Sequence, residues 1–530
     1  MRAAWLGALS GAWMAASWKA HARFRRALDE PEAAQARVLA RVLAGARESA
    51  YGRAHGLARV LTAREWQAAV PLVTYDALAP WIERVKNGER GVLTGEAVLM
   101  METTGGSSAA AKYIPYTAGL RAEFNRALQP WMFDLYTRRP GLLTCATYWS
   151  VSPAARVREV TAGGVPVGFA DDTEYFGGLE RFVMGQLMPA PGALAQLSDM
   201  DDHRYATLLF LLAEPRLGLI SVWNPTFLTL LMEFFEARRD ALAQDLARGT
   251  ITLPSGAAAP EALSSRFRPA KLGDPPWPHL QVISCWASAS AARFLPDLRA
   301  RFPRAEIQPK GLLATEGVVT IPLWDQAAPA LAVESHFYEF VPAGGGAPRL
   351  AHELEEGREY AVVLSTSGGL YRYQLGDVVR VAGHLRRAPL LELMGREATS
   401  DLCGEKLSEA LVARVLDEAM GGVRAEFALV APWMERPPRY VLHVESAAAA
   451  ADLTRLGGRV EEGLAANPHY AYCRRLGQLG PLGVFRVTRG GAAAHLAACV
   501  ARGQKPGSVK CAVLERADRW ELAFEGALVG

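Results

Sequence analysis

The sequence predicts an α/β protein with a large N-terminal domain and a small C-terminal domain. Apolar runs of strand length alternate with longer helical stretches, and these runs are residues 141–149, 217–223, 281–286 and 306–313. Strands that alternate with helices favour a largely parallel sheet, with ligand groups at the strand ends. A boundary at 395–404 sets apart roughly 130 further residues, a size typical of a small domain. With 530 residues, half of them apolar, the chain is long enough for two or three domains.

The first part of the chain is expected to be helical. Residues 3–18 are apolar, and a signal peptide is one interpretation of them. We favour an amphipathic helix packed on the domain, because Lys19, His21 and Arg23 end the apolar run early and no run reaches the length of a membrane span. Peripheral membrane contact by this helix stays open. Further helices are expected over residues 31–45, 61–70, 75–85, 118–136, 205–213 and 225–246.

A loop of small hydroxylated residues follows the N-terminal helices. An apolar run at 97–101 predicts a buried strand, residues 103–108 read TTGGSS, and Lys112 comes four residues later. Small residues let the backbone approach a ligand closely, and hydroxyl groups, backbone N–H groups and a lysine all bind phosphate. A nucleotide-binding loop is the functional interpretation. A plain surface turn is the alternative, because short Gly/Ser patterns recur by chance.

The later chain is expected to add antiparallel strands and then a compact α+β unit. The strands are expected at residues 335–340, 360–364 and 370–382. The small domain is expected to contain helices at 407–420 and 450–465 and strands at 425–430 and 440–444.

Composition and charge exclude several classes of function. The formal charge of +3 is spread along the chain without a basic tail, which argues against a nucleic-acid partner. The 10 histidines lack ligand spacing, so no structural metal site is expected. The six cysteines form no CxxC pair and indicate reduced thiols in a cytoplasmic protein, and a monomer is expected.

Three further segments carry residues suited to nucleotide chemistry. In LLATEG, 312–317, a strand delivers Glu316, and a carboxylate at a strand end can hold a magnesium ion. In YRYQLGDVVRV, 371–381, Asp377 can grip two ribose hydroxyls. In GQKPGSVK, 503–510, lysines lie on a loop shaped by proline and glycine. A helix cap, a turn aspartate and surface lysines are the respective structural alternatives.

Together, in this order, the segments resemble those of the acyl acid amido synthetases, a family of the adenylate-forming superfamily that includes plant enzymes conjugating auxin, jasmonate and benzoates to amino acids. ETTGGSSAAAKYIPYT resembles the first family motif, LLATEG the second and YRYQLGDVVRV the third. The resemblance extends over the whole chain. Other similar segments are VPLVTYDALAPWIERVKNGE at 70–89, SHFYEF at 335–340, NPHYAYCRRLGQLGPLGVFRV at 467–487 and Gln-Lys-Pro at 504–506.

The resemblance implies roles for individual residues. The implied nucleotide-binding positions are Thr103, Thr104, Gly105, Ser107, Ser108, Ser288, Leu312, Leu313, Ala314, Thr315, Glu316, Gly317, Phe337, Asp377 and Arg396. Glu316 would bind Mg²⁺, Asp377 would hold the ribose and the Phe337 ring could stack on the base. Lys112 would complete the phosphate loop, and Lys505 would be a mobile lysine that neutralises the α-phosphate. These two lysines and Glu316 are the implied catalytic residues.

The acyl pocket is expected among the aromatic residues that follow the loop. The candidates are Trp131, Phe133, Tyr148, Trp149, Trp223 and Phe227. Plain core packing is the alternative for each, since aromatic residues at helical spacing usually pack in a core.

The resemblance also implies a mechanism and a domain layout. Residues 1–396 would form an adenylation domain, 397–404 a hinge and 405–530 a small mobile domain. The protein would use ATP and Mg²⁺ to convert a carboxylic acid into an acyl adenylate with release of pyrophosphate. An amine, expected to be an amino acid, would then attack the acyl group and displace AMP. The small domain would rotate between the two steps.

Three alternatives remain from the sequence. The first is a ligase that passes the acyl group to coenzyme A or another thiol. The second is a nucleotide- or acid-binding regulator without turnover, suggested by a departure from the family loop: Gly106 replaces a threonine, and alanines at 109–111 replace its glycine-rich end. The third is a membrane-associated scaffold, suggested by the apolar N-terminal helix.

Overall fold

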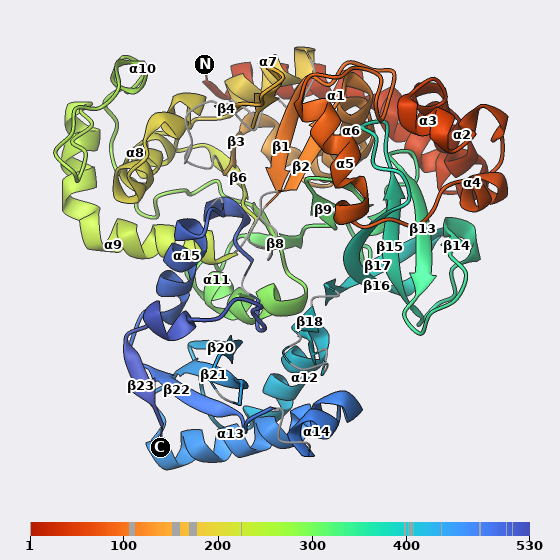
Figure 1. Ribbon diagram of the computed structural model, residues 1–530. Coiled ribbons are helices and arrows are strands. Elements are labelled where there is room, and N and C mark those ends of the chain that lie inside the picture. Colours follow the sequence, from red (N-terminus) through yellow and green to blue (C-terminus); the bar gives the residue numbers. More distant parts are fainter. Residues whose placement is uncertain are drawn as a thin grey trace.

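The protein consists of a broad body formed by the N-terminal part of the chain and a smaller body formed by the C-terminal part (Figure 1). The computed structural model describes residues 2–104, 112–150, 159–168, 178–223, 225–396, 399–400, 402, 405, 407–435, 437–475, 479–504, 506–510 and 512–529. The larger body contains two hydrophobic clusters and the smaller body contains two more. This arrangement confirms the predicted α/β class.

The predicted parallel sheet is present in the larger body. Its order is β3–β6–β7–β8, and each neighbouring pair is parallel. The strands are β3 (Ala146–Trp149), β6 (Leu217–Ser221), β7 (Val282–Cys285) and β8 (Glu306–Pro309). Helices α8 (Met200–Leu212), α9 (Pro225–Arg248) and α11 (Leu295–Arg301) connect them or cover them. All four strands therefore end at one edge of the sheet.

Two of the expected strands are shorter than predicted. The chain from Pro140 to Thr144 is a 3₁₀ turn, so β3 starts only at Ala146. Proline is favoured at the first position of such a turn, which explains why this apolar run does not begin as a strand. At the other edge, β8 ends at Pro309, and the next residues turn into a small hairpin of β9 (Leu313–Ala314) and β10 (Gly317–Val318).

A second, seven-stranded sheet lies beside the first, and its neighbouring strands are antiparallel, as the later strands were predicted to be. Its order is β11 (Thr320–Ile321), β12 (Ala330–Leu331), β17 (Ala388–Arg396), β16 (Tyr373–Leu385), β15 (Glu359–Ser365), β13 (Phe337–Pro342) and β14 (Arg349–Leu350). Four helices of the N-terminal part lie on the same side of the larger body as this sheet (Figure 1). They are α2 (Pro31–Ala46), α3 (Ala50–Ala54), α4 (Ala63–Ala69) and α5 (Tyr75–Lys86).

The N-terminal apolar run forms helix α1 (Arg2–Ala27), which packs on the larger body as expected. Its buried face includes Trp13, whose ring meets Tyr136 of α6 (Ala118–Arg138) edge-on at 5.5 Å, while Trp18 on another face is 59% exposed. Among the described residues, no helix is long and apolar enough to cross a membrane.

The strand before the hydroxylated loop starts later than predicted. It is β1 (Met100–Thr104), which pairs with β2 (Lys112–Tyr116) and belongs to a sheet of order β2–β1–β5–β4 with β5 (Pro166–Val167) and β4 (Glu159–Val160). Thr103 is therefore part of a strand. Thr117 caps α6 directly after β2, since its hydroxyl accepts the Leu120 N–H at 3.1 Å.

The smaller body is an α+β unit, as predicted. Its sheet has the order β20 (Phe427–Trp433), β21 (Arg439–Glu445), β22 (Gly483–Val487) and β23 (Gly526–Leu528). Its helices are α12 (Glu409–Ala419), α13 (Ala450–Leu464), α14 (Pro468–Arg475) and α15 (Gly491–Ala501). Figure 1 shows α15 at the side of the small body that faces the larger one. The last two strands and the helices α14 and α15 were not predicted.

Candidate functional site

The main pocket lies where the parallel sheet, the seven-stranded sheet and the smaller body meet. It encloses about 800 Å³ of space, including the part open to solvent. It is lined by Trp286, Ala287, Ser288, Ala291, Lys310, Gly311, Leu312, Leu313, Thr320, Pro329, Asp377, Leu391, Leu393, Gly395, Glu409 and Lys510. Ser288, Leu312, Leu313 and Asp377 are four of the predicted nucleotide-binding residues, so the structure brings these distant positions into one cavity.

Asp377 reaches this pocket from β16, and its residue is only 1% exposed. The backbone of Arg396 on β17 lies directly across from it in the antiparallel register. Gly395, beside Arg396, also lines the pocket. The two positions predicted to approach the ribose are thus neighbours across one strand pair, while the side chain of Arg396 lies outside the described residues.

The β9–β10 hairpin holds the predicted metal ligand. Glu316 lies in its turn and is 4% exposed, although it is not among the residues that line the main pocket. The Tyr116 hydroxyl donates to the backbone oxygen of Thr315 at 2.6 Å, and the Val318 N–H donates to His336 Nε2 at 3.0 Å. A Cβ on Gly317 would lie 2.8 Å from that same nitrogen, so only glycine lets the hairpin approach the imidazole so closely.

A buried carboxylate–imidazole pair supports this hairpin from behind. His336 Nδ1 lies 3.0 Å from Glu123 Oε2, and both side chains are fully buried. Because Nε2 accepts the Val318 N–H, the imidazole proton is on Nδ1 and is donated to the carboxylate. Ser367 donates its N–H and its hydroxyl to the same carboxylate at 3.1 and 2.5 Å. Helix α6 therefore determines where the Glu316 turn lies.

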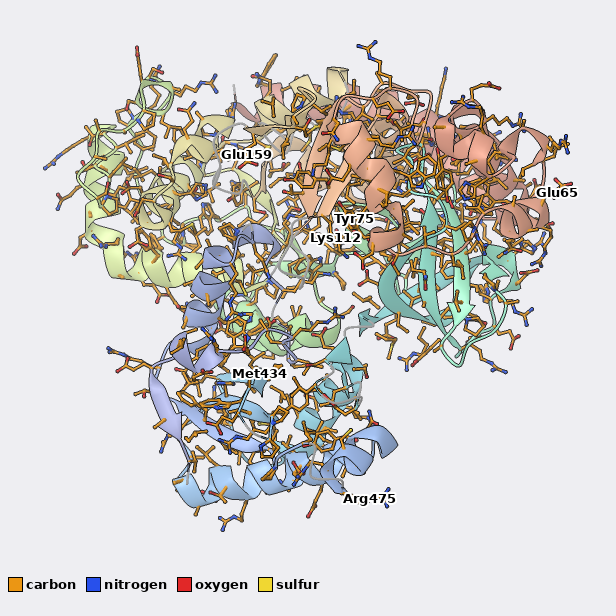
Figure 2. The ribbon with its side chains drawn as sticks, in the orientation of Figure 1. Glu65, Tyr75, Lys112, Glu159, Met434 and Arg475 are labelled. Carbon is orange, nitrogen blue, oxygen red and sulfur yellow. The ribbon has the colours of Figure 1, made fainter. Side chains whose placement is uncertain are left out.

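The phosphate-loop prediction is described only at its two ends. Thr103 pairs with Tyr113 and Thr104 pairs with Lys112 across β1 and β2. Lys112 lies beside Tyr75, with its ammonium 5.5 Å from the ring (Figure 2). Neither Thr103 nor Lys112 lines the main pocket. Gly105, Ser107, Ser108 and the side chain of Thr104 lie outside the described residues.

The remaining predicted nucleotide positions lie in the hairpin or in the core. Ala314 belongs to β9 and Gly317 to β10. Phe337 is buried at the start of β13 and packs in the hydrophobic cluster of the larger body. It does not line the main pocket.

Most of the predicted acyl-pocket residues gather at the carboxyl edge of the parallel sheet. Trp131 of α6 meets the Trp149 ring at 6.0 Å and donates its indole N–H to Gln308 Oε1 at 3.1 Å. Trp223 follows β6 closely, and the centre of its ring lies 5.8 Å from the centre of the Trp286 ring, which lines the main pocket. Tyr148 is fully buried in the cluster that packs under the sheet. Phe133 instead packs against His21 and Trp18 of α1, away from this edge.

A second hollow of about 530 Å³ separates α9 from α15. It is lined by Met200, Arg204, Phe227, Leu230, Ala492, His495, Leu496, Pro506, Gly507 and Val509. Phe227 is therefore at the boundary between the two bodies. Lys505 lies outside the described residues, but its neighbours Pro506 and Gly507 line this hollow, and Lys510 lines the main pocket with its ammonium 5.4 Å from the Trp286 ring.

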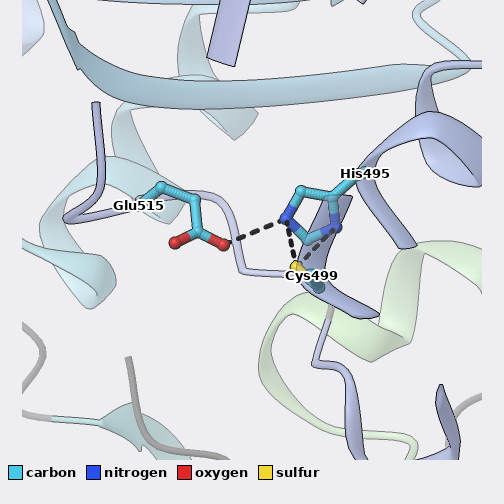
Figure 3. A group of neighbouring side chains, drawn as sticks. All are labelled: His495, Cys499 and Glu515. Carbon is cyan, nitrogen blue, oxygen red and sulfur yellow. Dashed lines mark hydrogen bonds and ion pairs between the residues drawn. The ribbon is translucent and has the colours of Figure 1, made fainter. Parts of the chain in front are cut away.

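A polar cluster joins the two ends of this lysine-bearing segment (Figure 3). His495 Nε2 lies 3.0 Å from Glu515 Oε1 and 3.7 Å from Cys499 Sγ. Carboxylate and thiol thus approach the same ring nitrogen, while Trp520 stacks on the imidazole at 4.8 Å. Among the described residues, His495, Cys499 and Glu515 are side chains of types that ligate metals and lie close together. The spacing of the histidines in the sequence did not predict this cluster. The contact between His495 and Glu515 therefore links α15 to the chain that follows the 506–510 stretch.

Sequence reasoning missed Lys310, Glu409 and Lys510 as pocket residues. Lys310 follows β8 directly, and a polar residue at the carboxyl end of a parallel strand is a signal that was present in the sequence. Glu409 and Lys510 come from the smaller body, and their position depends on how that body docks. No sequence pattern predicts such a placement.

Models of one protein family match almost the whole chain. The GH3 family N-terminal domain matches residues 20–307, the GH3 family central domain 330–396 and the GH3 family C-terminal domain 409–517. The chain is 26% identical over 467 residues to the probable indole-3-acetic acid-amido synthetase GH3.2 of Oryza sativa subsp. japonica, covering 78% of this chain and 75% of that protein. It is also 26% identical over 526 residues to the indole-3-acetic acid-amido synthetase GH3.8 of Oryza sativa subsp. indica, covering 87% and 84%.

Two similar solved structures support the fold. The GH3.15 acyl acid amido synthetase superposes with a TM-score of 0.78 at 19% identity, covering 95% of this chain and 94% of that one. The AtGH3.15 acyl acid amido synthetase in complex with 2,4-DB gives a TM-score of 0.79 at 19% identity, covering 94% of each chain.

Proposed function

The chain belongs to the GH3 family, and on that premise we propose that it is an ATP-dependent acyl acid amido synthetase. It activates a carboxylic acid as an acyl adenylate, releases pyrophosphate, and transfers the acyl group to the amino group of an amino acid. One observation carries the proposal: Asp377 and the 312–313 stretch, from separate sheets, line one pocket with Ser288. Family models that match most of the chain support the reaction class.

The first half-reaction needs a place for ATP and compensation of its charge. The main pocket would take the adenosine, with Asp377 on the ribose hydroxyls and Ser288, Leu312 and Leu313 around the base. Glu316 offers carboxylate oxygens, the ligands Mg²⁺ prefers, in a turn held by two hydrogen bonds, so this residue suits a magnesium ion. When bound, that ion would neutralise charge on the phosphates.

Lysines would supply the remaining positive charge. We assign Lys505 to the α-phosphate and Lys112, at the start of β2, to the outer phosphates. Lys510 lines the pocket from the smaller body and adds a second cation that this body brings to the nucleotide. The carboxylate of the substrate then attacks the α-phosphorus, the bond to pyrophosphate breaks, and the resulting mixed anhydride is an electrophile that an amine can attack.

We propose that residues 1–396 act as the adenylation domain and that the smaller body moves between the two half-reactions. The link between them has a structural basis. The Leu402 N–H and the Tyr440 hydroxyl both donate to the buried Glu405, at 2.6 and 2.5 Å. These contacts tie the pair of β18 (Thr399–Ser400) and β19 (Leu407–Ser408) to the smaller body, which supports a pivot before Thr399, at the start of the predicted 397–404 hinge. The four described cysteines are buried and form no disulfide with one another, which supports a cytoplasmic location.

Exchange of radiolabelled pyrophosphate into ATP, measured with a panel of aryl and alkyl acids, tests the first half-reaction. We expect exchange that depends on both the acid and Mg²⁺. Product analysis with amino acids and with coenzyme A as acceptors then separates an amide from a thioester. Thioester formation without amide would replace the proposal by a thiol ligase, and absence of exchange across the panel would favour a binding protein without turnover.

A further inference from the structure

Three helices bring a group of arginines together around the segment that precedes β13. Arg23 comes from α1, Arg37 and Arg41 come from α2, and Arg126 comes from α6. Because Arg37 and Arg41 are four residues apart, they lie on the same face of their helix. None of the four arginines lines the main pocket, and the proposed reaction uses none of them. We call this group the arginine cluster.

Three members of the arginine cluster converge on Glu334, which is 5% exposed. Arg23 Nε donates to the Glu334 carboxylate at 2.9 Å. Arg41 and Arg126 both donate to the backbone oxygen of the same residue, at 3.1 and 3.0 Å. Two guanidinium groups thus share one carbonyl oxygen, so two positive charges are held close together with a neutral acceptor between them.

Positive charge exceeds negative charge at the arginine cluster. Among the described residues, Glu123 and Glu334 are the carboxylates whose charges act on Arg41 and Arg126. The Glu123 carboxylate is already engaged by the His336 imidazole at 3.0 Å. The guanidinium groups therefore outnumber the carboxylates near them.

The ionisation of these arginines reflects the same imbalance. Burial lowers the pKa of the Arg126 guanidinium, and the neighbouring charges of Arg41 and Arg23 lower it further. Partial burial lowers the pKa of Arg41 as well, and the charges of Arg23 and Arg37 act in the same direction. A lowered pKa of a guanidinium means that its surroundings oppose the positive charge. An anion bound between the guanidinium groups would offset that opposition.

The arginine cluster is accessible from solvent. Arg37 and Arg41 are exposed, Arg126 is partly exposed and the Arg23 side chain is 50% exposed. A guanidinium group presents its N–H donors in a planar fork that matches the oxygens of a phosphate group. Several such groups at one place favour a ligand group with more than one negative charge, and a phosphate monoester has nearly two at neutral pH.

We propose that the arginine cluster is a binding site for a phosphate group, carried by a small phosphorylated anion and separate from the main pocket. The phosphate oxygens accept hydrogen bonds from arginines of α1, α2 and α6 at once, so the bound ligand links the three helices. This inference does not depend on the proposed reaction.

Calorimetric titration of pyrophosphate into the full chain tests the site, because pyrophosphate carries the proposed chemistry and no other group. We expect the double variant Arg41→Gln/Arg126→Gln to weaken this binding about 100-fold or more, since each lost hydrogen bond to a charged group accounts for about 10-fold or more. Pyrophosphate should also raise the Tm of the wild type, and the double variant should lose this rise. Any pyrophosphate bound in the main pocket would stay bound in the double variant.

A matched control removes two arginines elsewhere. Arg266 and Arg304 are exposed, and Arg266→Gln/Arg304→Gln is expected to leave the affinity for pyrophosphate unchanged. If the double variant of the arginine cluster does not fold, Arg37→Glu replaces it, because this exposed position tolerates a charge reversal that should weaken binding about 10-fold.

A second probe identifies the source of the phosphate group. Sedimentation with phosphatidylcholine vesicles that contain phosphatidic acid is compared with sedimentation with phosphatidylcholine alone. Binding to phosphatidic acid that depends on the arginine cluster, without binding of pyrophosphate, would assign the site to a lipid headgroup. Unchanged binding of both probes in the folded variants, or binding of neither probe to the wild type, would overturn the inference. Neither measurement requires turnover, so failure of the proposed function is detected separately, by pyrophosphate exchange.

Discussion

Glu123 on α6 and His336 before β13 form a fully buried pair in which His336 Nδ1 lies 3.0 Å from Glu123 Oε2. The other imidazole nitrogen holds the hairpin that carries Glu316. The position of the predicted magnesium ligand therefore depends on a chain of hydrogen bonds that starts on α6, a helix far from Glu316 in the sequence.

Glu123→Gln is expected to destabilise the protein by about 1–3 kcal/mol, the cost of unmatched buried donors. The new NH₂ would face the Nδ1–H of His336, and a tautomer change would only transfer the mismatch to the Val318 N–H. Urea unfolding measures the loss, and the turnover number for pyrophosphate exchange is expected to fall because the turn with Glu316 shifts. Glu48→Gln, at an exposed site, is the control; equal effects of the two variants would refute the role of this chain of hydrogen bonds.

Glu316→Gln is expected to reduce pyrophosphate exchange by about 100-fold or more, because a neutral amide is a weaker ligand of Mg²⁺ than a carboxylate. The measurement is a Mg²⁺ titration of the exchange rate. A rightward shift of the magnesium dependence supports the metal role. An unchanged magnesium dependence with a lower rate would show that Glu316 acts by another route.

Asp377→Asn is expected to raise the KM for ATP about 10- to 100-fold, since two hydrogen bonds from ribose hydroxyls lose a charged acceptor. The KM for the acid should change little. Asp417→Asn, on the exposed side of α12, provides a matched control. A larger change in the acid KM than in the ATP KM would contradict the assignment to the ribose.

Ala398→Pro is expected to lower amide formation about 10-fold or more while pyrophosphate exchange stays within about 2-fold, because proline fixes the backbone at the proposed pivot. Ala398→Gly, which frees the same bond, is the matched counterpart. Both rates are measured on the same preparation. Parallel loss of the two half-reactions in the proline variant would argue against a moving small domain.

Stability is expected to fall as the pH drops from 6.5 toward 4. Burial lowers the pKa of His443 from 6.5 to about 4, between the rings of Phe485 and Phe524. In this window the unfolded chain binds a proton that the folded chain rejects, so the free energy of unfolding decreases by about 2 kcal/mol at pH 5 for this residue and levels off below about 4. Burial lowers the pKa of His203 to about 4 as well and adds to the effect.

Urea unfolding at pH 7 and pH 5 checks this prediction. His443→Leu should lose less stability between the two pH values than the wild type, whatever its stability at pH 7. His279→Leu, at an exposed site, should follow the wild type. The same loss in all three proteins would show that His443 does not contribute.

The parts of the fold that could be predicted are those with a local pattern. The strands β6 and β7 lie where the apolar runs predicted them, because a fully buried parallel strand needs only a short apolar run. The strand β3 is shorter than expected because Pro140 starts a turn. The strand β22 was missed, because its pairing partner β21 lies far away along the chain and its own run is short.

The candidate site shows the same division. Asp377, Ser288 and the 312–313 stretch were predicted from motifs, and the pocket unites them. The contact between Glu123 and His336 was not predicted, because no sequence pattern links a glutamate within α6 to a histidine before β13. Lys310 was missed for a related reason: its buried position depends on where Trp149 and Trp223 lie, and these belong to other strands or loops.

Glu409 and Lys510 form part of the wall of the main pocket, although both belong to the body that the proposed mechanism moves. A nucleotide seated there would touch both partners of the joint. Movement of the smaller body would therefore change the wall around a bound nucleotide, so a compound that bridges Lys510 and Asp377 would hold the two bodies together and stop the cycle between its two half-reactions.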